Sequence, residues 1–199
     1  MSFQNRTDEE LMKEYIAGHE QAFEELAHRF EKPVLNFVYP YFRNQTISED
    51  ITQDIFVRLV ESKNQYNPER PFKPWLYQIA RNRVYDELRK KKRWSLRLFQ
   101  PKEENELSQK TGAVPDPTLS PRETLNQSRL RDILLESIQS LDIKSRDMVI
   151  LRHLQGLSVR ETAEILELPE GTVQSGTYRA LQSLEKVLIQ KGISPEDLR

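Results

Sequence analysis

The sequence predicts an all-α protein with two small helical domains joined by a flexible linker. Apolar residues recur at three- and four-residue spacing in nearly every segment of the 199 residues, and no long segment alternates apolar with polar residues as a strand would. Residues 98–122 break this pattern with four prolines among Ser, Thr, Gln and Glu, a composition typical of a linker. After them, a helix, a tight turn and a second helix indicate a separate domain.

The composition excludes several classes of protein. Thirty Lys and Arg balance 31 Asp and Glu, so the chain has no uniformly basic coat, and the absence of cysteine excludes disulfides and thiolate sites. The three histidines are far apart in the sequence, and no nucleophile motif or Gly-rich phosphate loop occurs. We therefore expect no catalytic residue, no metal and no cofactor. The longest apolar run is far shorter than a membrane span of about 20 residues, and the first ten residues lack a signal pattern, which predicts a cytoplasmic protein.

The N-terminal elements are predicted from their apolar faces. Residues 8–42 form the first helices, with Phe23, Leu26 and Phe30 on one face and a kink at Pro33. The next helix is expected to begin at Ser48, whose hydroxyl would cap the free N–H groups. Its inward face is expected to hold Ile51, Ile55, Phe56 and Leu59, and residues 67–71 read as a loop.

A long helix is predicted over residues 74–93, with an apolar stripe that steps by four from Leu76 to Leu88. Residues 81–97 contain eight bases and two acids, the strongest concentration of positive charge in the chain. This run could be a solvated helix end, where cations interact favourably with the helix dipole. Aromatic residues before it and polar residues beside it suit an unpaired nucleic-acid strand instead. Trp75 taken alone fits the core better than a stacking platform.

The second domain shows a helix-turn-helix pattern. Gly156-Leu157-Ser158 forms a turn, Ser158 and Glu161 form a capping box, and a break at 167–169 leads into a helix over about 170–189. An ordinary helical hairpin is the alternative. Residues 158–190 contain three bases and five acids, which predicts weak independent binding to duplex DNA. The residues that the second helix would present to a major groove are Thr172, Gln174, Ser175, Tyr178 and Arg179.

Three segments together resemble the extracytoplasmic-function sigma factors, the smallest class of bacterial RNA polymerase initiation factors. SEDITQDIFVRLV (48–60) is similar to the polymerase-binding helix of the family, and FKPWLYQIARNRVYD (72–86) to the segment that melts the downstream promoter element. The turn at 156–158 through PEGTV (169–173) is similar to the helix-turn-helix that reads the upstream element. The resemblance covers almost the whole chain.

The resemblance implies a polymerase-binding and promoter-melting domain over 1–97, a linker over 98–122 and an upstream-element domain over 123–199. It implies that the protein binds core RNA polymerase and promoter DNA, both duplex and melted, with an anti-sigma factor as a possible further partner. The implied polymerase contacts are Asp50, Gln53, Asp54, Phe56 and Arg58. The implied downstream DNA contacts are Trp75, Arg81, Asn82, Arg83, Tyr85, Asp86, Arg89, Lys90 and Arg93, with a base pocket formed by residues 64–73 and the face of Asn82.

The chain departs from the family pattern in the second domain. Glu167 stands where the family usually has Gly in the turn, and Gln174, Gly176 and Thr177 stand where it typically has Lys, Arg and Leu. Gly176 is also expected to weaken its helix. A repressor or activator that binds duplex DNA alone, and an adaptor that binds only proteins, are the competing classes, with an enzyme the weakest. The sequence names neither the promoter nor the inducing signal.

Overall fold

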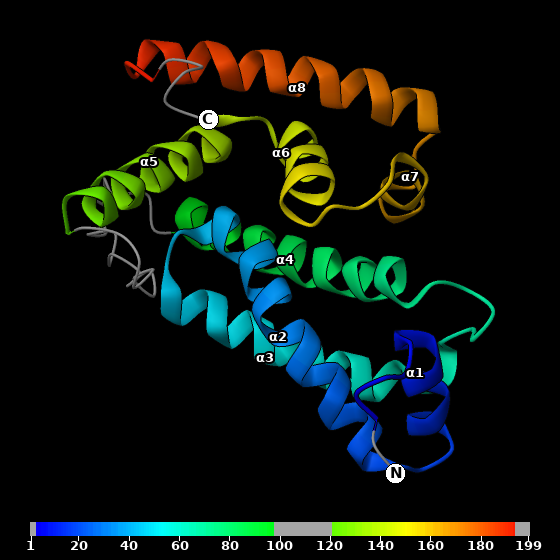
Figure 1. The fold of residues 1–199 in the computed structure, drawn as a ribbon. Coiled ribbons are helices and arrows are strands. Elements are labelled where there is room, and N and C mark those ends of the chain that lie inside the picture. Colours follow the sequence, from blue (N-terminus) through cyan, green and yellow to red (C-terminus); the bar gives the residue numbers. More distant parts are fainter. Residues whose placement is uncertain (1–2, 98–120, 194–199) are drawn as a thin grey trace. The chain divides into compact units, whose positions relative to one another are not determined.

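The computed structural model describes residues 3–97 and 121–193, and these form two compact units that we treat separately. The first unit contains α1 to α4 and the second α5 to α8 (Figure 1). Over these described ranges the regular structure is entirely helical, so the predicted all-α class is confirmed. Among the same residues, none of the helices is both long enough and apolar enough to cross a membrane.

The first unit is a helical bundle around one apolar core. Its elements are α1 (Asp8–Ile16), α2 (Glu20–Phe42), α3 (Gln45–Ser62), the 3₁₀ turn η1 (Lys63–Gln65) and α4 (Phe72–Arg97). The long α2 continues through Pro33 and Pro40 and contacts α1, α3 and α4. Its Phe30 ring lies 5.2 Å from the ring of Phe72 in an edge-on contact, which joins α2 to the first turn of α4. The core therefore fixes where α4 begins.

The predicted start of α3 at Ser48 is wrong. Asn44 is the N-cap, and its side chain accepts a hydrogen bond from the backbone N–H of Ile47 at 3.0 Å. Ser48 lies fully buried one turn later, where its hydroxyl donates to the Asn44 carbonyl at 2.7 Å. Both residues are good caps, and the choice between them depends on how α2 ends, with Arg43 in the left-handed conformation (φ 49°). Ile51, Ile55 and Leu59 are buried as predicted, whereas Phe56 is half-buried.

The second unit contains the helix-turn-helix. Its elements are α5 (Pro121–Ser140), α6 (Ile143–Val149), the π-helical turn η2 (Ile150–Leu154), α7 (Val159–Leu166) and α8 (Glu170–Gln190). The predicted capping box is present, because Ser158 N–H donates to Glu161 at 2.7 Å and Glu161 N–H donates to the Ser158 hydroxyl at 3.2 Å. Residues 98–120 of the predicted linker lie outside the described residues. Its last two residues, 121 and 122, belong to α5 instead.

Candidate nucleic-acid interfaces

One face of α4 presents polar and cationic side chains along its length. Asn82, Arg89 and Arg93 are exposed, and their spacing of seven and four residues places them along one line of the helix. Beside this line, the guanidinium of Arg81 lies 4.5 Å from the centre of the Tyr85 ring. A cation stacked on an aromatic ring offers both charge and a flat surface, and unpaired bases bind such pairs.

Asn82 also lines a shallow groove of about 300 Å³ between α4 and the C-terminal end of α3. The other lining residues are Arg58, Glu61, Ser62, Gln65 and Ile79. Of the loop over 64–73 that was expected to form a base pocket with Asn82, Gln65 is the residue that the structure brings into this groove. An amide, a guanidinium and a carboxylate around one concave site can donate and accept hydrogen bonds at the edge of a base.

Arg83 does not belong to this exposed face. Its side chain is only 8% exposed and donates to Asp54 Oδ2 from Nε at 2.9 Å and from Nη2 at 2.7 Å. Its Nη1 donates to Glu87 at 2.9 Å. Arg83 was predicted to be a DNA contact, but the structure buries it and bonds it to α3, because the run of like charges in the sequence does not show which cation faces α3. Arg83 joins α4 to α3.

A second pair of charges joins the same helices and involves two other candidates. Arg58 Nη1 donates to Asp86 Oδ2 at 3.0 Å, and Arg89 Nη2 donates to Asp86 Oδ1 at 2.6 Å. The hydrogen bond from Arg89, followed by that from Arg58, holds the pKa of Asp86 below its usual value. Asp86 therefore stays ionised and orients two guanidinium groups at the surface.

These ion pairs change how the outer surface of α3 is interpreted. Of the predicted polymerase contacts, Asp54 is exposed and Arg58 is half-buried, and each is already bonded to α4. Asp50 and Gln53 are exposed and have no such bond to α4 among the hydrogen bonds and ion pairs described. Asp50 and Gln53 thus provide the part of this surface that a substitution can alter without loosening α4.

Trp75 lies in an aromatic cluster at the start of α4. Its ring is 4.9 Å from that of Tyr66 and 6.0 Å from that of Phe72, and its side chain is half-buried. Trp75 thus packs against core aromatic residues while part of its side chain stays exposed, and its predicted contact with DNA stays a prediction.

The C-terminal end of α4 adds a residue that the sequence analysis missed. Trp94 is 69% exposed and follows Lys90, Lys91 and Arg93, which are exposed as well. An exposed aromatic ring among cations is the arrangement that binds stacked bases. The signal was present in the sequence as a tryptophan four residues after Lys90, one helical turn away.

The second candidate interface is the outer face of α8. All five residues predicted to face a major groove are exposed, among them Tyr178 at 64%. Gln182, one turn further on, donates from Nε2 to the Tyr178 hydroxyl at 3.0 Å, which extends the polar face beyond the predicted residues. The exposed residues of this face are Thr172, Gln174, Ser175, Tyr178, Arg179 and Gln182.

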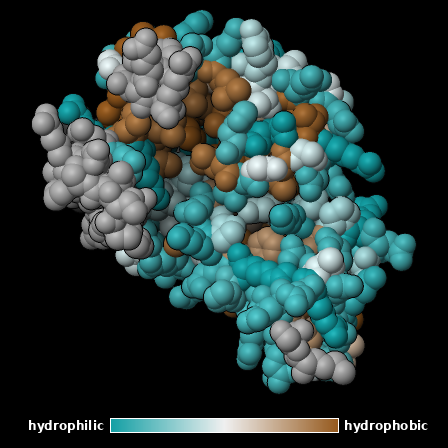
Figure 2. All heavy atoms as spheres, in the orientation of Figure 1, coloured by the Kyte–Doolittle hydropathy of each residue, from teal (hydrophilic) through white to brown (hydrophobic). Residues whose placement is uncertain are grey.

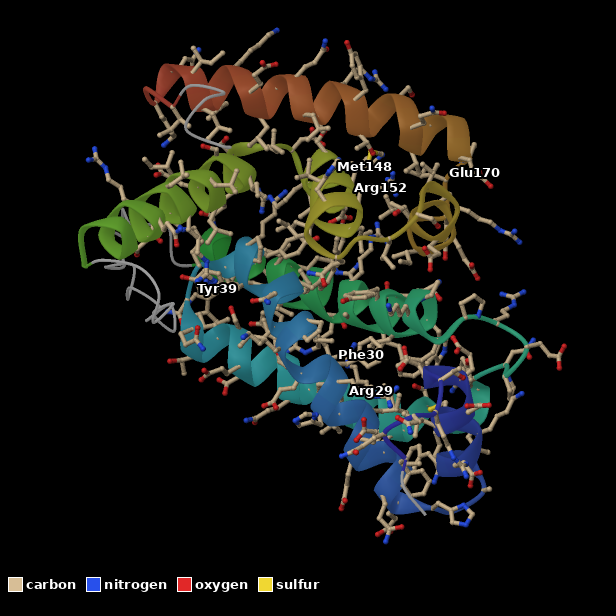
Figure 3. All side chains as sticks on the ribbon, viewed as in Figure 1. Arg29, Phe30, Tyr39, Met148, Arg152 and Glu170 are labelled. Atoms are coloured by element: carbon tan, nitrogen blue, oxygen red, sulfur yellow. The ribbon has the colours of Figure 1, made fainter. Side chains whose placement is uncertain are left out.

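Gly176 and Thr177 do not belong to that face. Both are buried, and a Cβ built on Gly176 would lie 2.5 Å from Met148 Sδ and 2.9 Å from its Cε. Met148 of α6 lies against α8 (Figure 3). Gly176 therefore does not mark a cationic contact that the exposed face has lost. Its lack of a side chain makes room for Met148 where α6 and α8 cross.

The turn before α8 explains why glycine suits position 167. Glu167 has φ 55°, the left-handed conformation that costs about 1 kcal/mol for a residue with a Cβ. The turn before α7 uses Gly156 for the same purpose, at φ 67°, and Arg152 donates to the Leu157 carbonyl there. A left-handed residue thus lies in the turn on each side of α7.

An apolar groove of about 600 Å³ follows the C-terminal half of α8 on the side of α5. Figure 2 shows the hydrophobic side chains gathered between these two helices. The lining includes Leu134, Leu181, Leu188, Ile189 and Ile193. This groove suits an apolar protein surface. Tyr178 and Gln182 of the polar face also line it, whereas Thr172 and Gln174 do not.

The described part of the chain contains no cluster of three or more His, Asp or Glu residues close enough to hold a metal ion. The exposed faces of α4 and α8 offer hydrogen-bonding groups, aromatic rings and positive charge. These are the groups with which proteins bind the phosphates and base edges of a nucleic acid.

Comparison with known proteins follows the same division. Residues 26–94 match the family model described as Sigma-70 region 2, and residues 131–184 match Sigma-70, region 4. The chain is 30% identical over 194 residues to the ECF RNA polymerase sigma factor BldN of Streptomyces coelicolor, covering 96% of this chain and 67% of that protein. It is 28% identical to SigW of Bacillus subtilis, an ECF sigma factor, covering 89% of this chain and 94% of the relative.

Solved structures show the same fold. CnrH, in complex with the cytosolic domain of CnrY, matches with a TM-score of 0.67 at 22% identity, over 92% of this chain and 97% of that one. The sigma factor RpoE of Bartonella quintana, in complex with the anti-sigma factor NepR, matches with a TM-score of 0.64 at 20% identity, over 83% of this chain and 96% of the other.

Proposed function

Because the chain belongs to the extracytoplasmic-function sigma factors, which bind core RNA polymerase and direct promoter-specific initiation of transcription, we propose how its residues divide that work. Residues 1–97 bind polymerase and open the downstream promoter element. Residues 123–199 bind the upstream element, and 98–122 connect the two. The protein has no catalytic residue of its own and acts where bacterial RNA polymerase acts, in the cytoplasm.

Promoter opening is assigned to the exposed face of α4 and the groove beside Asn82. Asn82 donates hydrogen bonds to an unpaired base and accepts them from it. The stacked pair of Arg81 and Tyr85 provides a surface on which a base can stack. Arg89, Lys90 and Arg93 bind phosphates, and Trp94 adds a second ring to this cationic end. The binding energy of the captured strand drives the melting. The observation that carries this assignment is the placement of Asn82 in a groove beside a cationic helix face.

Polymerase binding is assigned to the outer face of α3, through Asp50, Gln53 and the exposed part of Phe56. Asp54 and Arg58 contribute to the same surface while they remain bonded to α4. Upstream recognition is assigned to the polar face of α8, where the amide of Gln174 can pair with adenine. Two structural relatives are described in complex with CnrY and NepR, the latter an anti-sigma factor, and we propose that a regulator of this kind binds this chain as well.

The assignment of Asn82 is tested by transcription with purified core polymerase. We expect the wild-type chain to confer initiation at promoters selected from a randomised library, and Asn82→Ala to reduce permanganate reactivity of the opened thymines by about tenfold. Core binding, measured by competition with labelled wild type, should change less than twofold. Asn36→Ala is the matched control, since Asn36 is an exposed helical asparagine on α2.

Two results would contradict the proposal. Normal opening with Asn82→Ala would remove Asn82 from the pocket. Tight, sequence-specific binding of duplex DNA by the free chain, with no initiation from core polymerase, would favour the class of independent repressors or activators.

A further inference from the structure

The start of α4 lacks a capping side chain of its own. Its first free backbone N–H belongs to Phe72, and Arg70 and Pro71, which precede it, have no acceptor in their side chains. Asn67 is already used, because its Oδ1 accepts from the Glu69 N–H at 3.0 Å. The acceptor that the Phe72 N–H uses comes from outside the local sequence.

Glu9 of α1 provides that acceptor across 63 residues of sequence. Phe72 N–H donates to Glu9 Oε1 at 2.9 Å, in a partly buried place. A carboxylate at a helix N-terminus satisfies an unpaired donor and also interacts favourably with the helix dipole. The Phe72 side chain is fully buried, so the loss of this bond would leave an N–H beside the core with little access to water.

The same carboxylate lies next to the loop that leads into α4. The Tyr66 hydroxyl donates to the Arg70 carbonyl at 2.6 Å, which ties the two ends of the loop together. Burial, and then the charges of Glu9 and Asp8, raise the pKa of Tyr66 to about 12, so this hydroxyl keeps its proton. The loop over 66–71 is thus held by Tyr66 within it and by the bond of Glu9 to Phe72 directly after it.

Glu9 is itself held in place by its neighbours. Thr7 and Glu10 form a capping box at the start of α1. Asp8 pairs at 3.0 Å with Arg29 of α2, whose guanidinium also binds the carbonyls of residues 4 and 6 (Figure 3). The N-terminal segment and α2 therefore present the Glu9 carboxylate to α4 from a fixed position.

We propose that Glu9 is a positioning residue for promoter opening, which acts by capping α4 and holding the loop over 66–71 in place. This inference rests on the proposed role of α4 in melting. Glu9 lies outside the segment over 26–94 that matches the family model, and Glu9 makes no contact with DNA in this role. The ring of Trp75, the groove beside Asn82 and the cationic face all follow from where this first turn is held.

The test compares Glu9→Ala and Glu9→Gln, with Glu24→Ala, an exposed carboxylate on α2, as the control. In holoenzyme assembled with each full chain, Glu9→Ala should reduce opening of a duplex promoter by about tenfold, the low end of the effect of one lost hydrogen bond to a charged group. Glu9→Gln keeps an oxygen acceptor and should lose about twofold. Core binding and the Glu24→Ala control should remain at the wild-type level.

A template with a preformed bubble separates positioning from general damage. Because that template needs no strand opening, Glu9→Ala should transcribe it within twofold of wild type, and amide exchange at Phe72 should be about tenfold faster in the free variant. Equal losses on duplex and bubble templates, or opening like wild type with Glu9→Ala, would overturn the proposal. Failure of the wild-type chain to initiate at any promoter would instead refute the function on which the proposal rests.

Discussion

The two helices assigned to DNA, α4 and α8, present their polar residues in different ways. In α4, Arg83 and Asp86 are bonded to α3, so part of its charge serves to hold the unit together. In α8, Gln174 and Tyr178 are exposed, and the hydrogen bond from Gln182 to Tyr178 on this face stays within the helix. Charge in α4 is thus partly structural, whereas the face of α8 is available for recognition.

This difference shows why local charge is a poor guide to DNA contacts. The run over 81–97 carries a large positive charge, but Arg83 within it is buried and bonded to Asp54 and Glu87. The α7–α8 segment is acidic overall, but its exposed polar face is intact. Tethering to polymerase raises the effective concentration of a weakly binding domain, so α8 can read DNA without many cations.

The largest expected effect is a loss of folding stability, and it distinguishes Arg83 of α4 from Arg179 of α8. Arg83→Met removes three hydrogen bonds to carboxylates from a buried site and should lower the free energy of unfolding of the first unit by about 2–3 kcal/mol. Arg179→Met on the exposed face of α8 should change stability by less than about 0.5 kcal/mol. Chemical denaturation followed by circular dichroism measures both, and similar values for the two variants would contradict the comparison.

The next effect concerns affinity for DNA and its dependence on salt. Arg93→Gln should weaken holoenzyme binding to promoter DNA severalfold and reduce the slope of log K against log salt by about one, while Gln174→Lys should raise that slope by about one. Gln174→Ala should leave the slope unchanged and alter the preferred upstream sequence, because an amide reads base edges. Identical transcription of an upstream-element library by wild type and Gln174→Ala would show that this residue reads no base.

A smaller effect is expected in the turn before α8. Glu167→Gly relieves the left-handed strain at φ 55° and should stabilise the second unit by about 1 kcal/mol, less the extra entropy that glycine gives to the unfolded chain. Glu164→Gly, in the right-handed turns of α7, is the matched control and should destabilise by about 1 kcal/mol. A loss of melting temperature with Glu167→Gly would mean that the side chain contributes more than the strain costs.

The smallest expected effect is a change in how the stability of the first unit depends on pH. The pKa of Asp86 is lowered in the folded protein, so its contribution to stability is complete above the usual carboxyl pKa of about 3.9 and is lost as the pH falls through the lowered value. Asp86→Asn should therefore reduce stability slightly at neutral pH and flatten the decline below about pH 4. Asp50→Asn, with an exposed carboxyl on α3, is the control. Parallel acid curves for Asp86→Asn and wild type would contradict the role of its arginine partners.

Local patterns in the sequence were sufficient for the class of fold, the helix-turn-helix and the exposed residues of α8. Helical periodicity, the capping box at Ser158 and the unusual Glu167 depend on residues within one or two turns of each other, so they can be read from the chain. The family likewise follows from segments whose order and spacing are visible in the sequence.

Tertiary structure alone decided which of several suitable groups is used. Asn44 and Ser48 are both good caps, and only the end of α2 selects the former. The pairing of Arg83 with Asp54, the space that Gly176 leaves for Met148 and the capping of α4 by Glu9 each join residues from different helices. The sequence determines the periodicity that forms each helix, but the partner of a charge or a cap depends on which helices meet, and that is settled by burial of the core.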